Sequence, residues 1–426
     1  MQDRLGPINS KSVVVIIGGG PAGSSCAIRL KRICAAQKIC PRIIVYENKR
    51  FEKKSYYNQC LGVLSPPIEA ILESQLEIPF PSYIVQKVIN GYYIHSDHRT
   101  LKLPGEHEPS YACRRVEFDN YLFQKARKLG VETIPARATE IDFSPEGVMV
   151  YSESNNIKAD VVVGAFGLDD GMAETFGRLT SYRQPDFLFS VVTKIHVGES
   201  ALQDFGQYLH AFLPLSLPHV EFGAMTPKGN HLTCNIAGKH VDAEMMDRLL
   251  QLPVVKGNLP DDIDEILRHL YYFKGKFPTL PAKSFYGNRF VMVGDAAGLN
   301  RPFKGKGINS AIITGIRAAD TMVRVGISKR AFEAYRSDCC ELTDDIPYGK
   351  ALRFFANLAK RWGFMGGVLE VAETEPALRT VLFNIVSGHE TYKKTWSEAG
   401  RFRFFVRITL KVLGRRFRRP KKSDKR

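Results

Sequence analysis

The first fifty residues alternate between continuous apolar runs and one segment with helical periodicity. Residues 12–17 form a short, β-branched apolar run, which predicts a strand buried on both faces of a parallel sheet. Residues 21–37 start with proline, which is common in a first helical turn, and they predict a helix. Residues 42–46 predict a second buried strand, so this region is expected to form one βαβ unit.

The pattern changes several times further along the chain. Residues 51–110 are rich in Pro, Tyr, Ser and Gly and predict loops and strands of a second region. Residues 175–285 are strand-like with aromatic and Pro-rich turns, and the sequence beyond 330 is mostly helical in pattern. Further strands are expected within 131–143 and at 148–151, 159–163 and 289–293, and further helices at 115–129 and 307–325.

A glycine-rich turn follows the first predicted strand and has the spacing G-x-G-x-x-G. In this pattern the first glycine allows the sharp turn, the second lets the backbone approach a pyrophosphate, and the third lets the helix pack against the sheet. The start of the helix offers free N–H groups and a positive dipole end to phosphates. A carboxylate at the end of the second strand can accept hydrogen bonds from ribose hydroxyls. A purely structural turn is the alternative. The expected dinucleotide-binding residues are Gly18, Gly20, Pro21, Ala22, Gly23 and Glu47.

A second motif starts at Gly294 and follows the predicted strand at 289–293. Gly-Asp followed by small residues at a helix start suits a carboxylate that holds a ribityl chain. The N–H groups of the Gly-rich stretch 302–309 are expected to face the flavin edge on which reduction builds negative charge. Lys304 and Lys306 either add positive charge there or are solvated. The expected residues are Gly294, Asp295, Gly305, Gly307 and Ile308.

Together these motifs resemble the FAD proteins of the glutathione-reductase type, and among them the group of aromatic hydroxylases, halogenases and geranylgeranyl reductases. Arg115, Phe118, Asp119 and Leu122 match the R-x-x-F-D-x-x-L helix of that group. The resemblance implies FAD as cofactor, with Arg115 close to its phosphates or ribityl chain; a surface arginine is the alternative. It also implies an α/β fold: a Rossmann-like FAD-binding domain with an inserted strand-rich substrate domain and a helical C-terminal region.

The expected domain boundaries follow from this resemblance. The seven stretches are an FAD-binding βαβ unit at 12–58, a loop and substrate region at 59–108, the FAD-binding domain continued at 109–174, a β-rich substrate domain at 175–286, the flavin-contacting part of the FAD-binding domain at 287–330, a C-terminal helical region at 331–400 and a basic amphipathic tail at 401–426.

Three segments are similar to geranylgeranyl reductases in particular. Residues 60–66 resemble that family's C-G-x-x-L-S-P segment beside the flavin ring, with Leu61 in place of the first glycine. The resemblance makes Cys60 the candidate catalytic residue, since a thiol near a flavin can donate a proton or tune the ring; a core cysteine is the alternative. Residues 220–229 resemble, weakly, the Y-x-W-x-F-P-K-G strand that lines the lipid cavity. Residues 382–388 with Tyr392 are similar to the family's C-terminal helix ending.

The resemblance implies an FAD-dependent oxidoreductase that reduces C=C bonds of an isoprenoid or polyprenyl chain on a lipid or quinone, with Cys60 or a water as proton source. An FAD-dependent monooxygenase acting on an apolar substrate, and a non-catalytic flavin redox partner, stay open. So does the electron donor, NAD(P)H or a ferredoxin-like protein. Phe166 stands where the group has the aspartate of its A-D-G segment, which counts against direct use of NAD(P)H and against a standard aromatic monooxygenase.

Composition limits the other possibilities. The 426 residues are 44% hydrophobic and 24% charged, which is typical of a globular protein. The eight cysteines form no C-x-x-C pair, so neither a disulfide framework nor a zinc site is expected, and no metal is predicted. The first residues contain no apolar signal segment and no run of about 18 apolar residues occurs. We therefore expect a cytoplasmic protein, with peripheral attachment to a membrane as an option.

Most of the positive charge lies at the C-terminus. Residues 401–426 hold eight Arg and four Lys against one Asp, a net +11 of the +16 carried by the whole chain. Phe402, Phe405 and Val406 recur at helical spacing before a basic run. An amphipathic helix followed by basic residues is typical of binding to anionic lipid surfaces, where each basic residue contributes about 1 kcal/mol. A solvated tail is the plain alternative, and nucleic acid is unlikely because no nucleic-acid-binding motif accompanies the tail.

Overall fold

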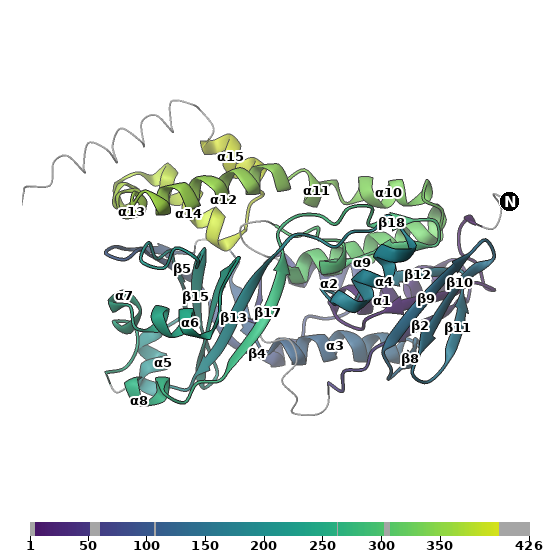
Figure 1. Ribbon diagram of the computed structural model, residues 1–426, viewed down its shortest axis with the longest axis horizontal. Coiled ribbons are helices and arrows are strands. Elements are labelled where there is room, and N and C mark those ends of the chain that lie inside the picture. The colour runs from purple at the N-terminus through teal and green to yellow at the C-terminus, as the bar shows by residue number, and fades with distance from the viewer. Residues whose placement is uncertain (1–4, 52–59, 106–107, 262, 302–306, 400–426) are drawn as a thin grey trace, which may run out of the picture. The chain divides into compact units, whose positions relative to one another are not determined.

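The computed structural model describes residues 5–51, 60–105, 108–261, 263–301 and 307–399. The chain forms two compact units, and Figure 1 labels their helices and strands. Unit 1 comprises Met1–Val85, Cys113–Leu188 and Lys276–Ile346, and unit 2 comprises Gln86–Ala112, Phe189–Gly275 and Pro347–Arg426. Each unit is therefore assembled from three separate stretches of the chain.

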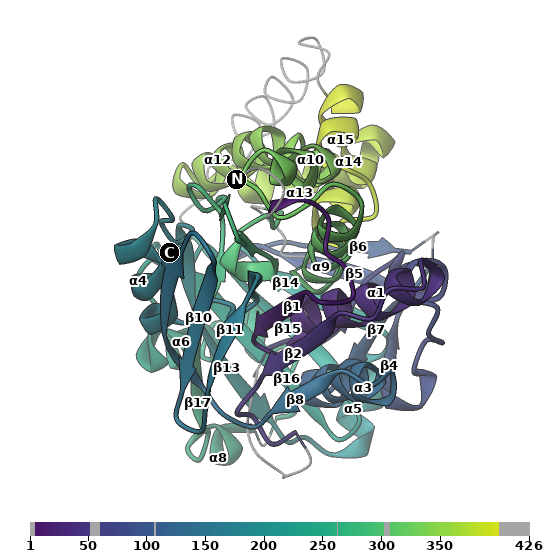
Figure 2. The same cartoon turned by 90° about the vertical axis from the view of Figure 1, so that its right-hand side faces the viewer.

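Unit 1 is built on a six-stranded sheet with the order β18-β19-β12-β1-β2-β8. The strand β1 pairs in parallel with β2 and β12, as Figure 2 shows for β1 and β2. Parallel pairing continues to β19 and β8, and β18 adds an antiparallel edge. The bounds are β1 Val13–Ile17, β2 Arg42–Tyr46, β8 Glu132–Ile134, β12 Val161–Gly164, β18 Tyr286–Gly287 and β19 Phe290–Met292. Val14, Val15 and Ile16 are fully buried, as expected of a strand covered on both faces, and the predicted βαβ unit is confirmed.

The helix α1 packs between α9 and α3 in unit 1. Gly315 of α9 makes the first contact possible, since a Cβ there would lie 2.3 Å from the carbonyl oxygen of Ala22. Unit 1 also contains a small antiparallel sheet of order β11-β10-β9, and β3 belongs to a further sheet of order β3-β7-β4. The remaining bounds are α1 Pro21–Ala36, β3 Val63–Leu64, α2 Ile68–Leu76, η2 Ser82–Ile84, α3 Arg115–Lys128, β9 Ala138–Ser144, β10 Gly147–Ser152, β11 Asn156–Ala159, α4 Asp170–Leu179, η3 Gly294–Ala296, α9 Gly307–Arg324, α10 Ala331–Asp338 and α11 Cys340–Thr343.

Unit 2 contains a seven-stranded sheet with the order β17-β13-β16-β15-β14-β5-β6. The pairing of β14 with β5 is parallel, and that of β15 with β14 and β16 is antiparallel. The bounds are β4 Val85–Ile89, β5 Gly91–His95, β6 Thr100–Pro104, β7 Ser110–Cys113, β13 Phe187–Ile195, α5 Glu199–Phe205, β14 Tyr208–Phe212, β15 Phe222–Lys228, β16 His231–Gly238, α6 Ala243–Leu250, α7 Pro253–Lys256, α8 Ile263–Leu267, β17 Tyr272–Pro278, α12 Ile346–Arg361, α13 Met365–Thr374, α14 Pro376–Ser387 and α15 Tyr392–Ala399.

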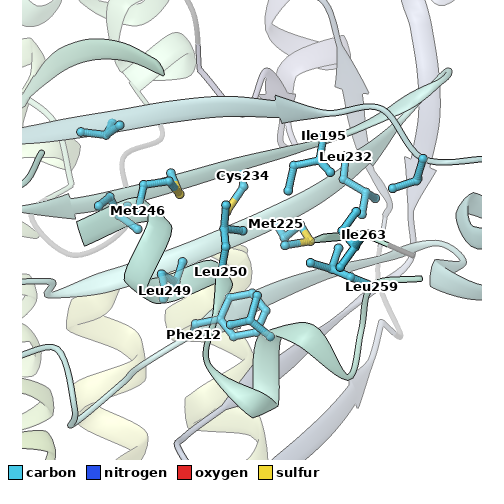
Figure 3. Packing of buried hydrophobic residues seen from close by; sticks show 14 of the residues in the cluster. Ile195, Phe212, Met225, Leu232, Cys234, Met246, Leu249, Leu250, Leu259 and Ile263 are labelled. Carbon is cyan, nitrogen blue, oxygen red and sulfur yellow. The ribbon is translucent and has the colours of Figure 1, made fainter. Parts of the chain in front are cut away.

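One face of the seven-stranded sheet is covered by short helices. Met225 and Cys234 of the sheet pack with Met246 and Leu249 of α6 in a buried cluster, shown in Figure 3. The same cluster includes residues of α5, α7 and α8. The sequence pattern predicted only strands here, because helices of four to eight residues are too short to show a helical period.

Two findings concern membranes and metals. Among the described residues, no helix is long and apolar enough to cross a membrane. Within the same part of the chain, no cluster of His, Cys, Asp and Glu side chains is arranged to hold a metal ion. The predicted basic tail, residues 401–426, lies outside the described residues.

Candidate functional site

The turn between β1 and α1 has the geometry that the glycine spacing predicted. Gly18 has a φ of +107°, and a Cβ there would lie 2.4 Å from the carbonyl oxygen of Ala165. A Cβ on Gly23 would lie 1.9 Å from the carbonyl oxygen of Gly18. A Cβ on Gly20, by contrast, would have no atom of the described chain within 4 Å. The first and third glycines are therefore needed by the turn itself, whereas Gly20 borders open space in which a ligand can approach the backbone.

The start of α1 faces the same turn. Gly20 is the N-cap, Pro21 is the first helical residue, and no described side chain caps the helix. The N–H groups of Ala22 and Gly23 belong to the first helical turn, which has no earlier carbonyl to bind within the helix. Together with the positive end of the helix dipole, they form a place for an anionic group such as a phosphate.

Glu47 lies at the end of β2, against the glycine turn. Its side chain is buried, and its Oε2 accepts a hydrogen bond of 2.9 Å from the Gly19 N–H. Its Oε1 accepts one of 2.8 Å from the Lys49 N–H. Since an ionised carboxylate has about four acceptor positions, Glu47 retains capacity for the hydroxyls of a ribose.

Arg115 starts α3 and is held by a buried carboxylate. Its Nε donates to Oδ1 of Asp119 at 2.6 Å, and Asp119 is completely buried. Burial opposes the charge, yet the pKa of the Arg115 guanidinium is raised, because Asp119, Cys60 and Asp295 lie near it. Arg115 is thus a fixed cation in a polar cluster and not a freely solvated surface arginine. The cluster brings together three residues that are far apart in the sequence, Cys60, Arg115 and Asp295.

Asp295 lies in the short turn η3 that follows β19. Burial raises the pKa of its carboxyl group, and Asp119 adds to that effect, whereas the hydrogen bond from Asn300 and the charge of Arg115 oppose it. Gly294, with a φ of +61°, turns the chain before it and donates its N–H to Oγ1 of Thr314. The carboxylate of Asp295 is therefore anchored in place.

Asn300 completes this part of the site. Its Nδ2 donates to Oδ1 of Asp295 at 2.8 Å, and the residue is almost fully buried. Its Oδ1 has no hydrogen-bond partner in the described part of the chain. A buried amide oxygen without a partner is unfavourable, so this atom fits a hydroxyl donor on a bound ligand. Gly307 lies beside this pair, since a Cβ there would lie 3.4 Å from Nδ2 of Asn300 and 3.8 Å from Oδ1 of Asp295.

The segment that contains Cys60 lies against the start of α9. Nδ2 of Asn309 donates to the carbonyl oxygen of Ser65 at 3.0 Å, and the Gly62 N–H donates to Sγ of Cys60 at 3.2 Å. Cys60 is half-buried, unlike a core cysteine. Ile308 is buried in the first turn of α9. The predicted residue Gly305, with Lys304 and Lys306, lies outside the described residues.

The chain is similar to several known proteins over about three-quarters of its length. No protein-family model matches the chain. It is 23% identical over 339 residues to digeranylgeranylglycerophospholipid reductase of Methanococcus vannielii, covering 76% of this chain and 80% of that protein. It is 22% identical over 336 residues to a probable electron transfer flavoprotein-quinone oxidoreductase of Escherichia coli, covering 73% and 76%.

Solved structures share the fold over nearly the whole chain. A geranylgeranyl bacteriochlorophyll reductase-like protein from Thermoplasma acidophilum superposes with a TM-score of 0.67 at 17% identity, covering 92% of this chain and 99% of that one. A flavin-dependent brominase also gives a TM-score of 0.67, at 16% identity, covering 93% and 99%. The chain is thus similar to geranylgeranyl reductase-like and flavin-dependent proteins over most of its length. The predicted α/β fold is confirmed, and the flavoproteins among these structures support the prediction of FAD as cofactor.

Phe166 is an apolar residue at the position where the resemblance predicts an aspartate. The ring of Phe166 stacks on that of Phe176 at 5.6 Å and meets the ring of Tyr182 edge-on at 6.3 Å. Phe166 is thus part of an aromatic cluster, which also reaches Phe290 through Phe176. The position contributes packing to this FAD-binding domain and offers no carboxylate.

Asn300 belongs to this site but was not among the residues predicted from the sequence. It lies five positions after Asp295, just before the Gly-rich stretch, so its place in the motif was visible. Its importance became apparent only from burial and from the unpartnered Oδ1, which no sequence pattern reports.

Proposed function

We propose that this flavoprotein reduces carbon–carbon double bonds in the isoprenoid chain of a lipid or quinone. The observation that carries the proposal is the convergence of Cys60, Arg115 and Asp295 in one cluster of the FAD-binding unit. The reductase named above, which matches three-quarters of the chain, supports the same reaction class. When bound, FAD supplies the hydride for such a reduction.

Different residues of unit 1 would bind different parts of FAD. The N–H groups at the start of α1 would bind the pyrophosphate, with Gly20 leaving room for it. Glu47 would accept the ribose hydroxyls. Asp295 and Asn300 together offer acceptors to the hydroxyls of the ribityl chain, and Arg115 adds a fixed positive charge.

Cys60 is proposed to hold the proton that the reaction needs. An isolated alkene is a poor hydride acceptor, so a proton donor has to act early, from a fixed position. The Gly62 N–H fixes Sγ of Cys60, and Asn309 fixes the segment that follows. A thiol held on this turn can offer its proton to the alkene from the same position in each reaction.

The proposal also includes docking to an anionic lipid surface through the basic tail. Phe354 and Trp362 expose 63% and 56% of their surface within and directly after α12. The rings of Phe355 and Trp396 lie 6.0 Å apart, so α15, which precedes the tail, lies against the same helix. Exposed aromatic residues and a polybasic segment in the same chain are the composition that binds a membrane interface.

An anaerobic experiment tests the reaction. The flavin is reduced with dithionite, a geranylgeranyl lipid or a menaquinone is added, and the flavin absorbance is followed. Reoxidation with a product heavier by two hydrogens per bond is expected. A flavin that stays reduced with these lipids, but gives a hydroxylated product with oxygen, would replace the proposal with a monooxygenase.

The similarity to a probable electron transfer flavoprotein-quinone oxidoreductase favours a second candidate, reduction of a quinone ring without change to its side chain. The same experiment separates the two. In that case menaquinone reoxidises the flavin, the product is menaquinol with an unchanged side chain, and a geranylgeranyl lipid without a quinone has no effect.

A further inference from the structure

One face of the sheet of unit 2 is covered by helices, and several polar side chains point to the other face. Met225 of β15 and Cys234 of β16 point to the helix-covered face, as Figure 3 shows. Successive side chains of a strand point to opposite faces, so Thr226, Thr233 and Asn235 point to the other one. The weak match to the lipid-lining strand in the sequence covers this part of β15.

The register places these polar side chains next to one another. Thr226 of β15 lies directly opposite Thr233 of β16, and Thr233 lies opposite Lys194 of β13. Asn235 follows two residues after Thr233 and therefore shares its face. Side chains directly opposite in adjacent antiparallel strands have Cβ atoms about 4.5–5.5 Å apart. Two hydroxyls, an amide and an ammonium group thus form one patch, named here the threonine patch.

Three atoms of the threonine patch are buried and lack partners. Thr226 and Thr233 expose 0% and 1% of their surface. Within the described chain, no group hydrogen-bonds Oγ1 of Thr226, Oγ1 of Thr233 or Oδ1 of Asn235. Buried polar atoms of native proteins are almost always hydrogen-bonded, and exceptions need an explanation such as a ligand or an ordered water.

Thr193 of β13 shows the ordinary case on the opposite face. It is equally buried, and its Oγ1 donates to the carbonyl oxygen of Tyr271 at 2.9 Å. The lack of partners is therefore not a general property of buried threonines in this sheet.

We propose that the threonine patch binds the hydroxyl-bearing polar end of the substrate. Threonine hydroxyls both donate and accept, and an amide oxygen accepts, so the patch complements a group that also donates and accepts. An alcohol has this chemistry, whereas a bare hydrocarbon would leave all three atoms without partners. The inference deepens the proposed function and rests on it, since it concerns the polar end of an isoprenoid substrate.

Equilibrium binding tests the inference without any reduction step. Geraniol, and the hydrocarbon of the same skeleton without the hydroxyl, are titrated into the oxidised, FAD-loaded protein in a calorimeter. Wild-type protein is expected to bind geraniol at least about tenfold more tightly, because a site built to bind a hydroxyl rejects the analogue that lacks it. A ratio near one would overturn the inference and would point to water as the partner of these atoms.

Matched variants assign the preference to the patch. The double variant Thr226→Val and Thr233→Val should bring the ratio close to one through loss of geraniol affinity, with an unchanged or higher Tm without ligand, since no described group bonds these hydroxyls. Thr193→Val should lower Tm and keep the ratio. A double variant that keeps the wild-type ratio would refute the inference. If the ratio behaves as expected but no double bond is reduced, the patch stands and the proposed function fails.

Discussion

A pair of glycine variants separates folding from cofactor binding in the turn before α1. In Gly20→Ala the backbone needs no change, because Gly20 has a φ of −68° and its Cβ would meet no atom of the described chain within 4 Å. The added methyl group nevertheless occupies the space in which the pyrophosphate would lie. Overpacking of a fitted site by one methyl group costs about 1–3 kcal/mol. FAD affinity should therefore fall by roughly 5- to 150-fold at 1.4 kcal/mol for each factor of ten.

Gly23→Ala is the matched control, since the same methyl group is added three residues later. Its Cβ would lie 1.9 Å from the carbonyl oxygen of Gly18, so the turn itself would have to move. The apoprotein of Gly23→Ala should lose several degrees of Tm, whereas apoprotein of Gly20→Ala should unfold at the wild-type temperature. Fluorescence titration of each apoprotein with FAD gives the affinities. Wild-type FAD affinity in Gly20→Ala would refute the assignment of this turn to the pyrophosphate.

Three further predictions follow from the site, the core of unit 2 and the tail. Cys60→Ala should keep FAD but lose about 100-fold or more in the rate of lipid reduction, as expected when a general acid is removed. Cys40→Ala, which changes an exposed cysteine, is the control. Full activity of Cys60→Ala would exclude the thiol as proton source. Burial lowers the pKa of His95 to about 4 and that of His210 to about 3, so the unfolded chain takes up these protons at a higher pH than the folded one. The free energy of unfolding should therefore fall as the pH drops from 6.5 towards 4, by about 3 kcal/mol for His95 alone. Urea unfolding measures this loss, which should be smaller in His210→Phe; a stability that does not change between pH 7 and pH 4 would contradict it. Removal of residues 401–426 should abolish sedimentation with anionic vesicles and leave FAD binding intact, and equal sedimentation of both proteins would exclude the tail as the anchor.

The FAD-binding unit was predictable from the sequence because its signals are local. The strand at 12–17, the glycine turn and the helix that follows are one continuous stretch, and the structure shows a steric reason for Gly18 and Gly23. The helix at 115–129 was equally visible from its apolar positions and was found as α3 at Arg115–Lys128. In contrast, α2 at Ile68–Leu76 was missed within a stretch that looked like loops, since its nine residues give few turns of periodicity.

The sequence could not show which individual polar atoms are buried without a hydrogen-bond partner. Asn300 and Thr233 look ordinary in the sequence, as one polar residue after a motif and one in a strand. Both residues become candidates for ligand binding only because folding buries them and leaves one oxygen of each without a hydrogen-bond partner in the described chain. Their different positions indicate different ligands: Asn300 is bonded to Asp295 in the FAD-binding unit, whereas Thr233 shares a patch with Thr226 in unit 2.

An unpaired buried oxygen destabilises the protein by about 1–3 kcal/mol until a ligand or water supplies the missing bond. The two sites should therefore respond to different additions: FAD should raise Tm in a manner that depends on Asn300, and an isoprenoid alcohol in a manner that depends on Thr226 and Thr233.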